Sequence, residues 1–291
     1  KTFSNTIEQA SIDEAYFEIE NLKFDPSADG RNLYPPKFSK KTWEGEQIWK
    51  KAETIAKKIK AEIKKKEKLT CSIGIGPNKL IAKIASDFRK PNGLTIITED
   101  EKESFLEPMT VRKIPGIGPK TEFLLKKMNV ATVRDLKGFT EFELFELMGK
   151  WGKELYQKVR GIDDSPLETF YESKSIGEQE TFDEDTRSPD ILIAKLNEMS
   201  ERVLRRMERE GFSGFRTIVI TVRFEGFETR TRSHTLSAHQ HSLEILRFGA
   251  LKLFMPFLDR RENPRNKKIR LVGVRMEKLI PSGNYHPATS E

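Results

Sequence analysis

The sequence predicts an α+β protein of several domains, because the spacing of apolar residues changes twice along its 291 residues. Strands alternate with helices over residues 1–98, which indicates a mixed α/β sheet with helices packed against it. Short helices with tight links fill residues 99–162, and residues 174–280 follow a β-α-β-β-α-β order, the ferredoxin-like split arrangement. A linker at 163–173 and a tail at 281–291 complete the division.

The first domain opens with two short strands within residues 7–19, which meet at Asp13 and Glu14. A connection rich in Pro, Gly, Asp and Ser follows at 24–45. Next comes an amphipathic helix, whose apolar residues recur every three or four positions from Ile48 to Ile63. We expect the lysines of residues 57–68 to form its solvated face. A strand at 69–75, a second helix after Asn78 and a strand at 94–97 complete the mixed sheet.

The last domain is predicted to pair strands at about 174–182, 217–222, 227–236 and 268–279 with two helices. A sheet of this kind carries both helices on one face and leaves the other face free. Five arginines of these strands are the candidates to line the free face, and we expect them to contact a polyanion: Arg223, Arg230, Arg232, Arg270 and Arg275.

Positive charge is concentrated in the C-terminal third. The net charge is +7, and residues 214–280 alone hold 14 Lys and Arg against 6 Asp and Glu, which leaves the rest near neutral. This distribution favours a nucleic-acid-binding module over a merely solvated basic surface. One cysteine, Cys71, excludes a disulfide framework. No apolar run reaches the roughly 20 residues of a membrane span, and no signal-peptide pattern is present.

Asp13 and Glu14 are the first candidates for chemistry. Neighbouring side chains of a regular strand point to opposite faces, but at a hairpin tip both carboxylates can converge on one hard cation such as Mg²⁺. Two carboxylates alone form an incomplete site, since phosphoryl transfer usually uses two metal ions and a bridging carboxylate. An exposed acidic turn is the alternative interpretation of this pair.

The run from Ile114 to Lys120, IPGIGPK, is the second candidate. Gly116 and Gly118 let the backbone turn tightly and approach a ligand closely. The helix that follows directs free amide groups at the turn, and Lys120 lies beside it. The turn is therefore suited to a DNA phosphate and indifferent to base sequence. We interpret it as the hairpin of a helix-hairpin-helix element, with a simple helix-linking turn as the alternative.

Lys90 precedes the stiff turn Pro91-Asn92-Gly93 and could meet a phosphate, although a lone lysine is more often merely solvated. His239 and His241 are two residues apart without an acidic cluster, which favours a solvated helix entry over a metal site. No Ser/His/Asp or Cys/His set for nucleophilic catalysis is evident.

Several of these segments occur in the order found in one family. Residues 11–16, SIDEAY, resemble the second catalytic-carboxylate motif of Y-family DNA polymerases, and residues 72–93 resemble the palm segment of that family. Residues 114–118 resemble its thumb hairpin. Residues 174–177 and 270–275 resemble the first and last strands of its little-finger domain. The motifs are most similar to the DNA polymerase IV/kappa branch, and the resemblance extends from about residue 7 to 279.

The resemblance implies the C-terminal part of a palm at 1–98, a thumb at 99–162 and a little finger at 174–280. The implied reaction is attack of a primer 3′-hydroxyl on the α-phosphate of a deoxynucleoside triphosphate, opposite a damaged template. By resemblance, Asp13 and Glu14 bind two catalytic Mg²⁺ ions and Lys90 contacts the triphosphate. Primer–template DNA is then expected to contact the turn of the thumb and the sheet of the little finger, at Gly116, Gly118, Lys120, Arg223, Arg230, Arg232, Arg270 and Arg275.

Family members begin with a further segment that carries the first metal-binding aspartate and the fingers. We therefore expect this chain by itself to bind DNA without polymerising. A non-catalytic DNA-binding remnant is the alternative function, and a helix-hairpin-helix nuclease or glycosylase is a disfavoured third. We expect a monomer that contacts no membrane, with a sliding clamp as a further partner that the resemblance allows. The expected compartment is the cytoplasm of a prokaryote, at the nucleoid, or the nucleus of a eukaryote.

Overall fold

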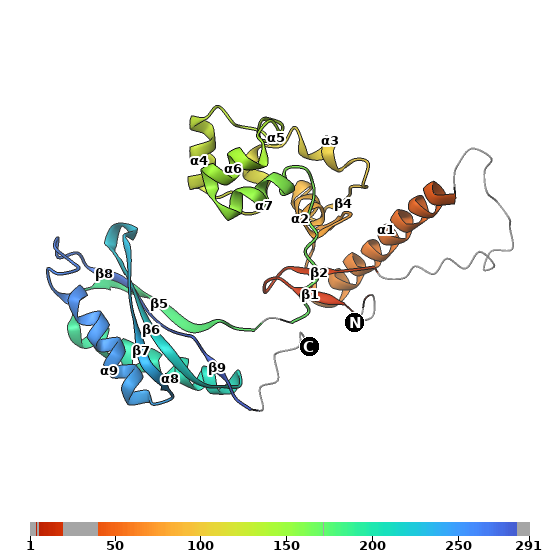
Figure 1. The fold of residues 1–291 in the computed structure, drawn as a ribbon. Helices are drawn as coiled ribbons and strands as arrows, with labels where there is room; N and C mark the ends of the chain where they lie inside the picture. Colours follow the sequence, from red (N-terminus) through yellow and green to blue (C-terminus); the bar gives the residue numbers. More distant parts are fainter. Residues whose placement is uncertain (1–3, 5, 20–39, 171, 284–291) are drawn as a thin grey trace. The chain divides into compact units, whose positions relative to one another are not determined.

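The computed structural model describes residues 4, 6–19, 40–170 and 172–283, and the side chains of residues 40–46 lie outside that description. The chain forms two compact units, Lys1–Glu168 and Thr169–Glu291 (Figure 1). Most of the connection predicted at 24–45 lies outside the described residues. From Lys40 the chain is helical, so the first helix begins before the predicted position.

The first unit opens with the strands β1 (Ile7–Gln9) and β2 (Ala15–Phe17), which pair antiparallel. The helix α1 (Lys40–Glu67) follows, then the strand β3 (Ile73–Ile75), the helix α2 (Lys79–Phe88) and the strand β4 (Leu94–Ile96). β3 and β4 pair parallel through the α2 crossover. The described strands of this unit therefore make two separate two-stranded sheets instead of the single mixed sheet that was predicted.

Short helices continue the first unit. They are α3 (Lys102–Leu106), α4 (Pro119–Lys127), α5 (Val133–Lys137), α6 (Glu141–Met148) and α7 (Lys150–Lys158), with a 3₁₀ turn at Val111–Lys113. Thr132 and Thr140 begin α5 and α6 with capping boxes, which satisfy amide groups that a helix start leaves free. Their apolar faces share one buried cluster with α2, including Ile81, Leu125 and Leu155.

The second unit has the predicted β-α-β-β-α-β order. It consists of β5 (Ser175–Thr186), α8 (Pro189–Arg209), β6 (Phe212–Phe224), β7 (Thr229–Gln240), α9 (Leu243–Phe254) and β8 (Ile269–Glu277), with 3₁₀ turns at Glu225–Phe227 and Met255–Leu258. The strands lie in the order β5-β8-β6-β7, with each neighbouring pair antiparallel, and a short β9 (Ile280–Pro281) pairs with β6. Each β-α-β pair is thus split by a strand of the other pair.

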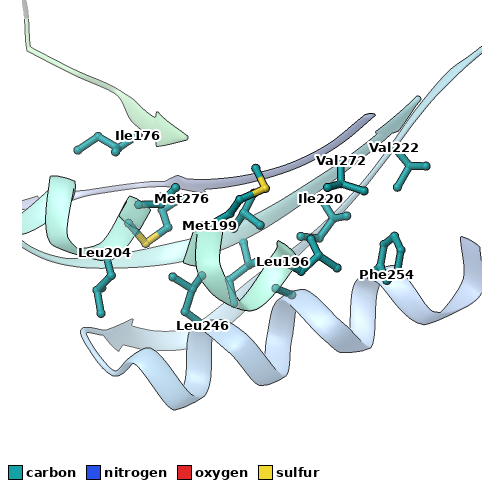
Figure 2. Packing of buried hydrophobic residues seen from close by; sticks show 14 of the residues in the cluster. Ile176, Leu196, Met199, Leu204, Ile220, Val222, Leu246, Phe254, Val272 and Met276 are labelled. Atoms are coloured by element: carbon teal, nitrogen blue, oxygen red, sulfur yellow. The ribbon is translucent and has the colours of Figure 1, made fainter. Parts of the chain in front are cut away.

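Both helices cover the same face of this sheet (Figure 1). Figure 2 shows Leu196 and Met199 of α8 and Phe254 of α9 packed against the strands, where they meet side chains such as Ile220 and Val272. All of these side chains are at most 2% exposed. The other face of the sheet carries no helix, so it is the surface that this core leaves available for a ligand.

Candidate functional site

Asp13 and Glu14 lie in the tight turn between β1 and β2. The backbone carbonyl of Glu14 accepts hydrogen bonds from the amides of Ala10 and Ser11, at 3.0 and 3.1 Å, which closes the turn. The hydroxyl of Ser11 donates to Oδ1 of Asp13 at 2.6 Å. Asp13 is exposed and Glu14 is half-buried. The two carboxylates therefore leave one turn, as the strand-turn-strand pattern of residues 7–19 predicted.

A chain of charges on α2 connects this turn with Lys90. The ammonium group of Lys83 forms an ion pair with Oε1 of Glu14, and it lies 3.5 Å from Oδ2 of Asp87. Asp87 in turn pairs with Lys90, at 2.5 Å between Oδ1 and Nζ. Lys83 and Asp87 are four residues apart and so share one helix face. Glu14 and Lys90, 76 positions apart in the sequence, are connected through two side chains.

Lys79, one turn earlier on the same face of α2, extends the contact with the hairpin. Its Nζ lies 2.6 Å from Oε2 of Glu8 in β1, and 5.6 Å from the centre of the Tyr16 ring in β2. The sequence reasoning missed the site roles of Lys79, Lys83 and Asp87. Their spacing of four residues was the available signal, since it places all three on one helix face.

The paired charges of α2 shift their pKa values. Burial alone would lower the pKa of Lys83, but the hydrogen bond to Glu14 and the charge of Asp87 outweigh it, and the pKa is raised. Burial alone would raise the pKa of Asp87, but the hydrogen bond from Lys90 and the charge of Lys83 outweigh it, and the pKa is lowered. Both shifts keep the groups charged at neutral pH.

The donors at this turn fit part of a Mg²⁺ site. Two carboxylates are hard oxygen ligands, and Glu14 already holds a cationic group, the ammonium of Lys83. Within the ranges that the structure describes, no group of three or more His, Cys, Asp and Glu is placed to hold a metal ion. Asp13 and Glu14 could therefore supply two ligands of such a site.

The turn at 114–120 has the geometry of an anion-binding hairpin. Gly116 has φ +100°, and a Cβ there would lie 3.1 Å from Nε1 of Trp151, so this position requires glycine. Arg112 donates to the carbonyl of Ile117 at 2.7 Å, and Gly118 precedes the first residue of α4 as an N-cap without a side chain to cap the helix. Among the described residues, no acceptor is found for the amides of Gly116, Gly118 and Lys120.

Strand register decides which of the predicted arginines reach the free face of the second sheet. In β6, Ile218, Ile220 and Val222 belong to the core under the helices, so the residues between them face the other way. Arg223 lies on this free face, opposite Thr229 of β7, and Arg275 lies there opposite Val219. The residues of β7 on this free face carry hydroxyl groups; they are Thr229, Thr231, Ser233 and Thr235.

The prediction that Arg230 and Arg232 line the free face is wrong. Register pairs them with Val222 and Ile220, on the side of the helices. There Arg230 bonds to Glu228 and Glu262, and Arg232 pairs with Glu262 at 2.5 Å. The reason is parity: the connection between β6 and β7 pairs Arg223 with Thr229, which turns even-numbered residues of β7 toward the core side.

Arg270 lies beside a register shift between β6 and β8. Its guanidinium stacks 4.9 Å from the centre of the exposed Phe227 ring and lies 3.4 Å from Oδ1 of Asp185. These contacts hold Arg270 at the end of the sheet where β6 turns into β7. The free face itself thus carries Arg223 and Arg275.

Three family models match the chain. The impB/mucB/samB family matches residues 1–87, the thumb domain of DNA polymerase iota matches 112–163, and the impB/mucB/samB C-terminal domain matches 173–288. In the part of the chain that the structure describes, no helix is long and apolar enough to cross a membrane.

Curated relatives of the chain are DNA polymerases. A DNA polymerase IV of Methanosarcina mazei is 38% identical over 277 residues, which cover 95% of this chain and 67% of the relative. A DNA polymerase IV of Leptospira interrogans is 33% identical over 274 residues, which cover 94% of this chain and 69% of the relative. The chain thus spans about two thirds of the length of these relatives.

Solved structures agree with these relatives. A Y-family DNA polymerase chimera of Dbh and Dpo4 is 26% identical and superposes with a TM-score of 0.76, covering 97% of this chain and 73% of that one. A ternary complex of Dbh is 25% identical, with a TM-score of 0.53, and the match covers 96% of this chain and 74% of that one.

Proposed function

Because the chain belongs to the Y family of DNA polymerases, the impB/mucB/samB family, we propose which of its residues carry the synthesis of DNA across damaged templates. The protein is a DNA-directed DNA polymerase of the translesion type, with a thumb of the helix-hairpin-helix kind. Its partners are DNA and a deoxynucleoside triphosphate. We also propose that the palm part ends at residue 98, the thumb at residue 162, and that the little finger begins at residue 174.

Asp13 and Glu14 hold Mg²⁺, and Lys90 contacts the triphosphate of the incoming nucleotide. The observation that carries this assignment is the chain of charges from Glu14 through Lys83 and Asp87 to Lys90. Through these ion pairs, the turn that carries the carboxylates and the side chain of Lys90 both contact the same helix, α2. The two groups are therefore held in a defined position relative to each other. A solvated acidic turn and an unrelated surface lysine would not require such a connection.

In the proposed reaction, the primer 3′-oxygen attacks the α-phosphate and pyrophosphate leaves. Bound Mg²⁺ would neutralise phosphate charge and favour the deprotonated 3′-oxygen. Lys90 adds positive charge beside the triphosphate, while Lys83 orients Glu14 by its ion pair. Catalysis then rests on positioning and charge neutralisation, which is typical of phosphoryl transfer.

DNA is bound by two surfaces in this proposal. The free amides of the 116–120 turn, with Lys120 beside them, hold a backbone phosphate without reading bases. The free face of the second sheet offers Arg223 and Arg275 within a field of threonine and serine hydroxyl groups. Arg270 lies at the end of that sheet. Arg230 and Arg232 do not belong to this surface, because they pair with Glu228 and Glu262 on the side of the helices.

Substitution of the carboxylates tests the proposal in the protein as its gene encodes it. We expect Asp13→Ala and Glu14→Ala each to abolish primer extension while DNA affinity is retained. Glu18→Gln, at an exposed carboxylate just after β2, is the matched control and leaves extension unchanged. Extension that survives both substitutions would overturn the role of the two carboxylates. A lack of extension in the unsubstituted protein would instead support the DNA-binding remnant.

The activity of the 291 residues alone stays a prediction. We expect them to bind primer–template DNA without extending it, and efficient extension with Mg²⁺ and all four deoxynucleotides would contradict this. A monomeric state and a sliding clamp also stay predictions. Sedimentation and pull-down with a purified clamp would test them.

A further inference from the structure

The ammonium group of Lys60, in α1, is surrounded by three hydrogen-bond acceptors. Its Nζ donates to the backbone carbonyl of Cys71, to Oδ1 of Asn92 at 2.8 Å and to the carbonyl of Gly93 at 3.1 Å. An ammonium group has three protons, so these acceptors use its full donor capacity. The sequence predicted that lysines 57–68 form a solvated face, and Lys60 departs from this because α1 packs beside β3 and β4.

The segment that Lys60 holds is the turn before β4. Asn92 has φ +56°, and a Cβ on Gly93 would lie 2.2 Å from the carbonyl oxygen of Arg89, so the turn is tightly folded. The amide of Gly93 donates to Oγ of Ser72 at 3.0 Å, and its carbonyl also accepts from the amide of Ile73 at 3.1 Å. Through two of these hydrogen bonds, Lys60 attaches this turn to α1.

Lys90 begins the same turn. Its ammonium group pairs with Asp87, yet its side chain is 55% exposed, so it remains accessible to a ligand. Lys90 is therefore held at two points: its ammonium group pairs with Asp87 of α2, and its backbone continues into the turn that is bonded to Lys60. A flexible lysine contributes most to binding when its backbone is already held in place.

We propose that Lys60 is a positioning residue of the polymerase: by fixing residues 91–93 it holds Lys90 where the triphosphate of the incoming nucleotide binds. This inference rests on the proposed role of Lys90. The three donors of the Lys60 ammonium group are used by acceptors of Cys71, Asn92 and Gly93. We therefore expect its effect on the reaction to pass through the turn to Lys90.

The test compares Lys60→Met with Lys64→Met in the protein as its gene encodes it. Met keeps most of the unbranched stem and removes the three donors. We expect Lys60→Met to raise the KM for deoxynucleotide about tenfold, with kcat changed less than about twofold. A rise of about tenfold corresponds to the loss of one charged hydrogen bond, here the proposed contact of Lys90 with the triphosphate. Lys64 lies one turn further along the same helix, is exposed, and serves as the matched control with unchanged kinetics.

Lys90→Ala shows whether the effect passes through Lys90. We expect Lys60→Met to add little to the KM of Lys90→Ala, because the two residues act as one unit. An unchanged KM in Lys60→Met, or an equal rise in both backgrounds, would overturn the proposal.

A third measurement separates this inference from the proposed function. If Lys90→Ala alone leaves the KM unchanged, the role of Lys90 fails, and with it the proposal that Lys60 positions it. Hydrogen exchange of the Gly93 amide then reports on the anchor alone. Faster exchange in Lys60→Met than in Lys64→Met would support the conclusion that Lys60 holds the turn. Equal exchange in the two variants would contradict it.

Discussion

Glu228 shows how a single residue stabilises the second unit through charge. It lies between the ammonium of Lys267, at 2.9 Å, and the guanidinium of Arg230, at 2.8 Å. These contacts lower the pKa of the Glu228 carboxyl group from 4.5 to about 2. The hydrogen bond from Lys267 makes the largest contribution, and the hydrogen bond from Arg230 the next largest. The ion pair with Lys267 joins the segment just before β8 to the end of the connection between β6 and β7.

This shift predicts a dependence of stability on pH. A lowered pKa in the folded state means that Glu228 stabilises the fold fully above about pH 4.5, and that this contribution is lost as the pH falls toward about 2. Thermal melts of Glu228→Gln and the unsubstituted protein should therefore differ at pH 6 and converge toward pH 2. Glu225→Gln, at an exposed neighbour, should show no such trend. A constant difference for Glu228→Gln would contradict the assignment.

Gly116 and Gly118 look equivalent in the sequence but are not equivalent in the fold. Gly116 has a positive φ and faces Trp151, whereas at Gly118 a Cβ would meet only Arg112, at 3.7 Å. We expect Gly116→Ala to cost about 1 kcal/mol or more of folding free energy, and Gly118→Ala to cost much less. Urea unfolding measures the two values, and equal costs would show that the turn relaxes around a side chain.

At the scale of elements, the start of α4 and the free face of the second sheet make separable contributions to DNA binding. Lys120→Met should weaken binding uniformly across DNA sequences and lower the slope of log K against log salt by about 1. Lys127→Met, at the far end of α4, is the control, since its ammonium stacks over Phe123 instead. A slope that stays unchanged in Lys120→Met would show that this residue does not contact the DNA backbone.

The two faces of β6 and β7 predict different consequences for their arginines. Arg223→Met and Arg275→Met, on the free face, should reduce DNA affinity and lower the salt slope. Arg232→Met should mainly lower thermal stability, because it breaks the ion pair with Glu262. Filter binding at several salt concentrations, beside thermal melts, separates the two effects. A larger loss of affinity in Arg232→Met than in Arg223→Met would contradict the assignment by register.

At the scale of the whole molecule, each compact unit has its own hydrophobic core. The core of the second unit runs from Ile176 to Met276 and includes no residue of the first unit. We therefore expect residues 169–291 to fold when they are expressed alone, with one cooperative transition. Phe254→Ala should lower the unfolding free energy of this fragment by about 3 kcal/mol, since Phe254 is fully buried.

Phe248→Ala is the matched control for that prediction. Phe248 lies on the same helix, α9, and is 71% exposed, so its removal should change stability little. A fragment that melts without a cooperative transition, although the whole chain has one, would show that the second unit depends on the first.

The sequence by itself determined the elements and the local motifs of this protein. Apolar spacing predicted the order β-α-β-β-α-β, and the turn residues placed Asp13 and Glu14 together, because these features depend on neighbours within a few positions. The resemblance to Y-family polymerases added the reaction, and the relatives support it.

Only the tertiary structure decided which side chains meet. Strand register, set by pairing between distant segments, placed Arg223 and Arg275 on the free face and turned Arg230 and Arg232 away from it. The contacts of Lys83 with Glu14 and of Lys60 with the 91–93 turn span 69 and more than 30 positions. No local pattern encodes such contacts, since they arise from the packing of α1 and α2 against the strands.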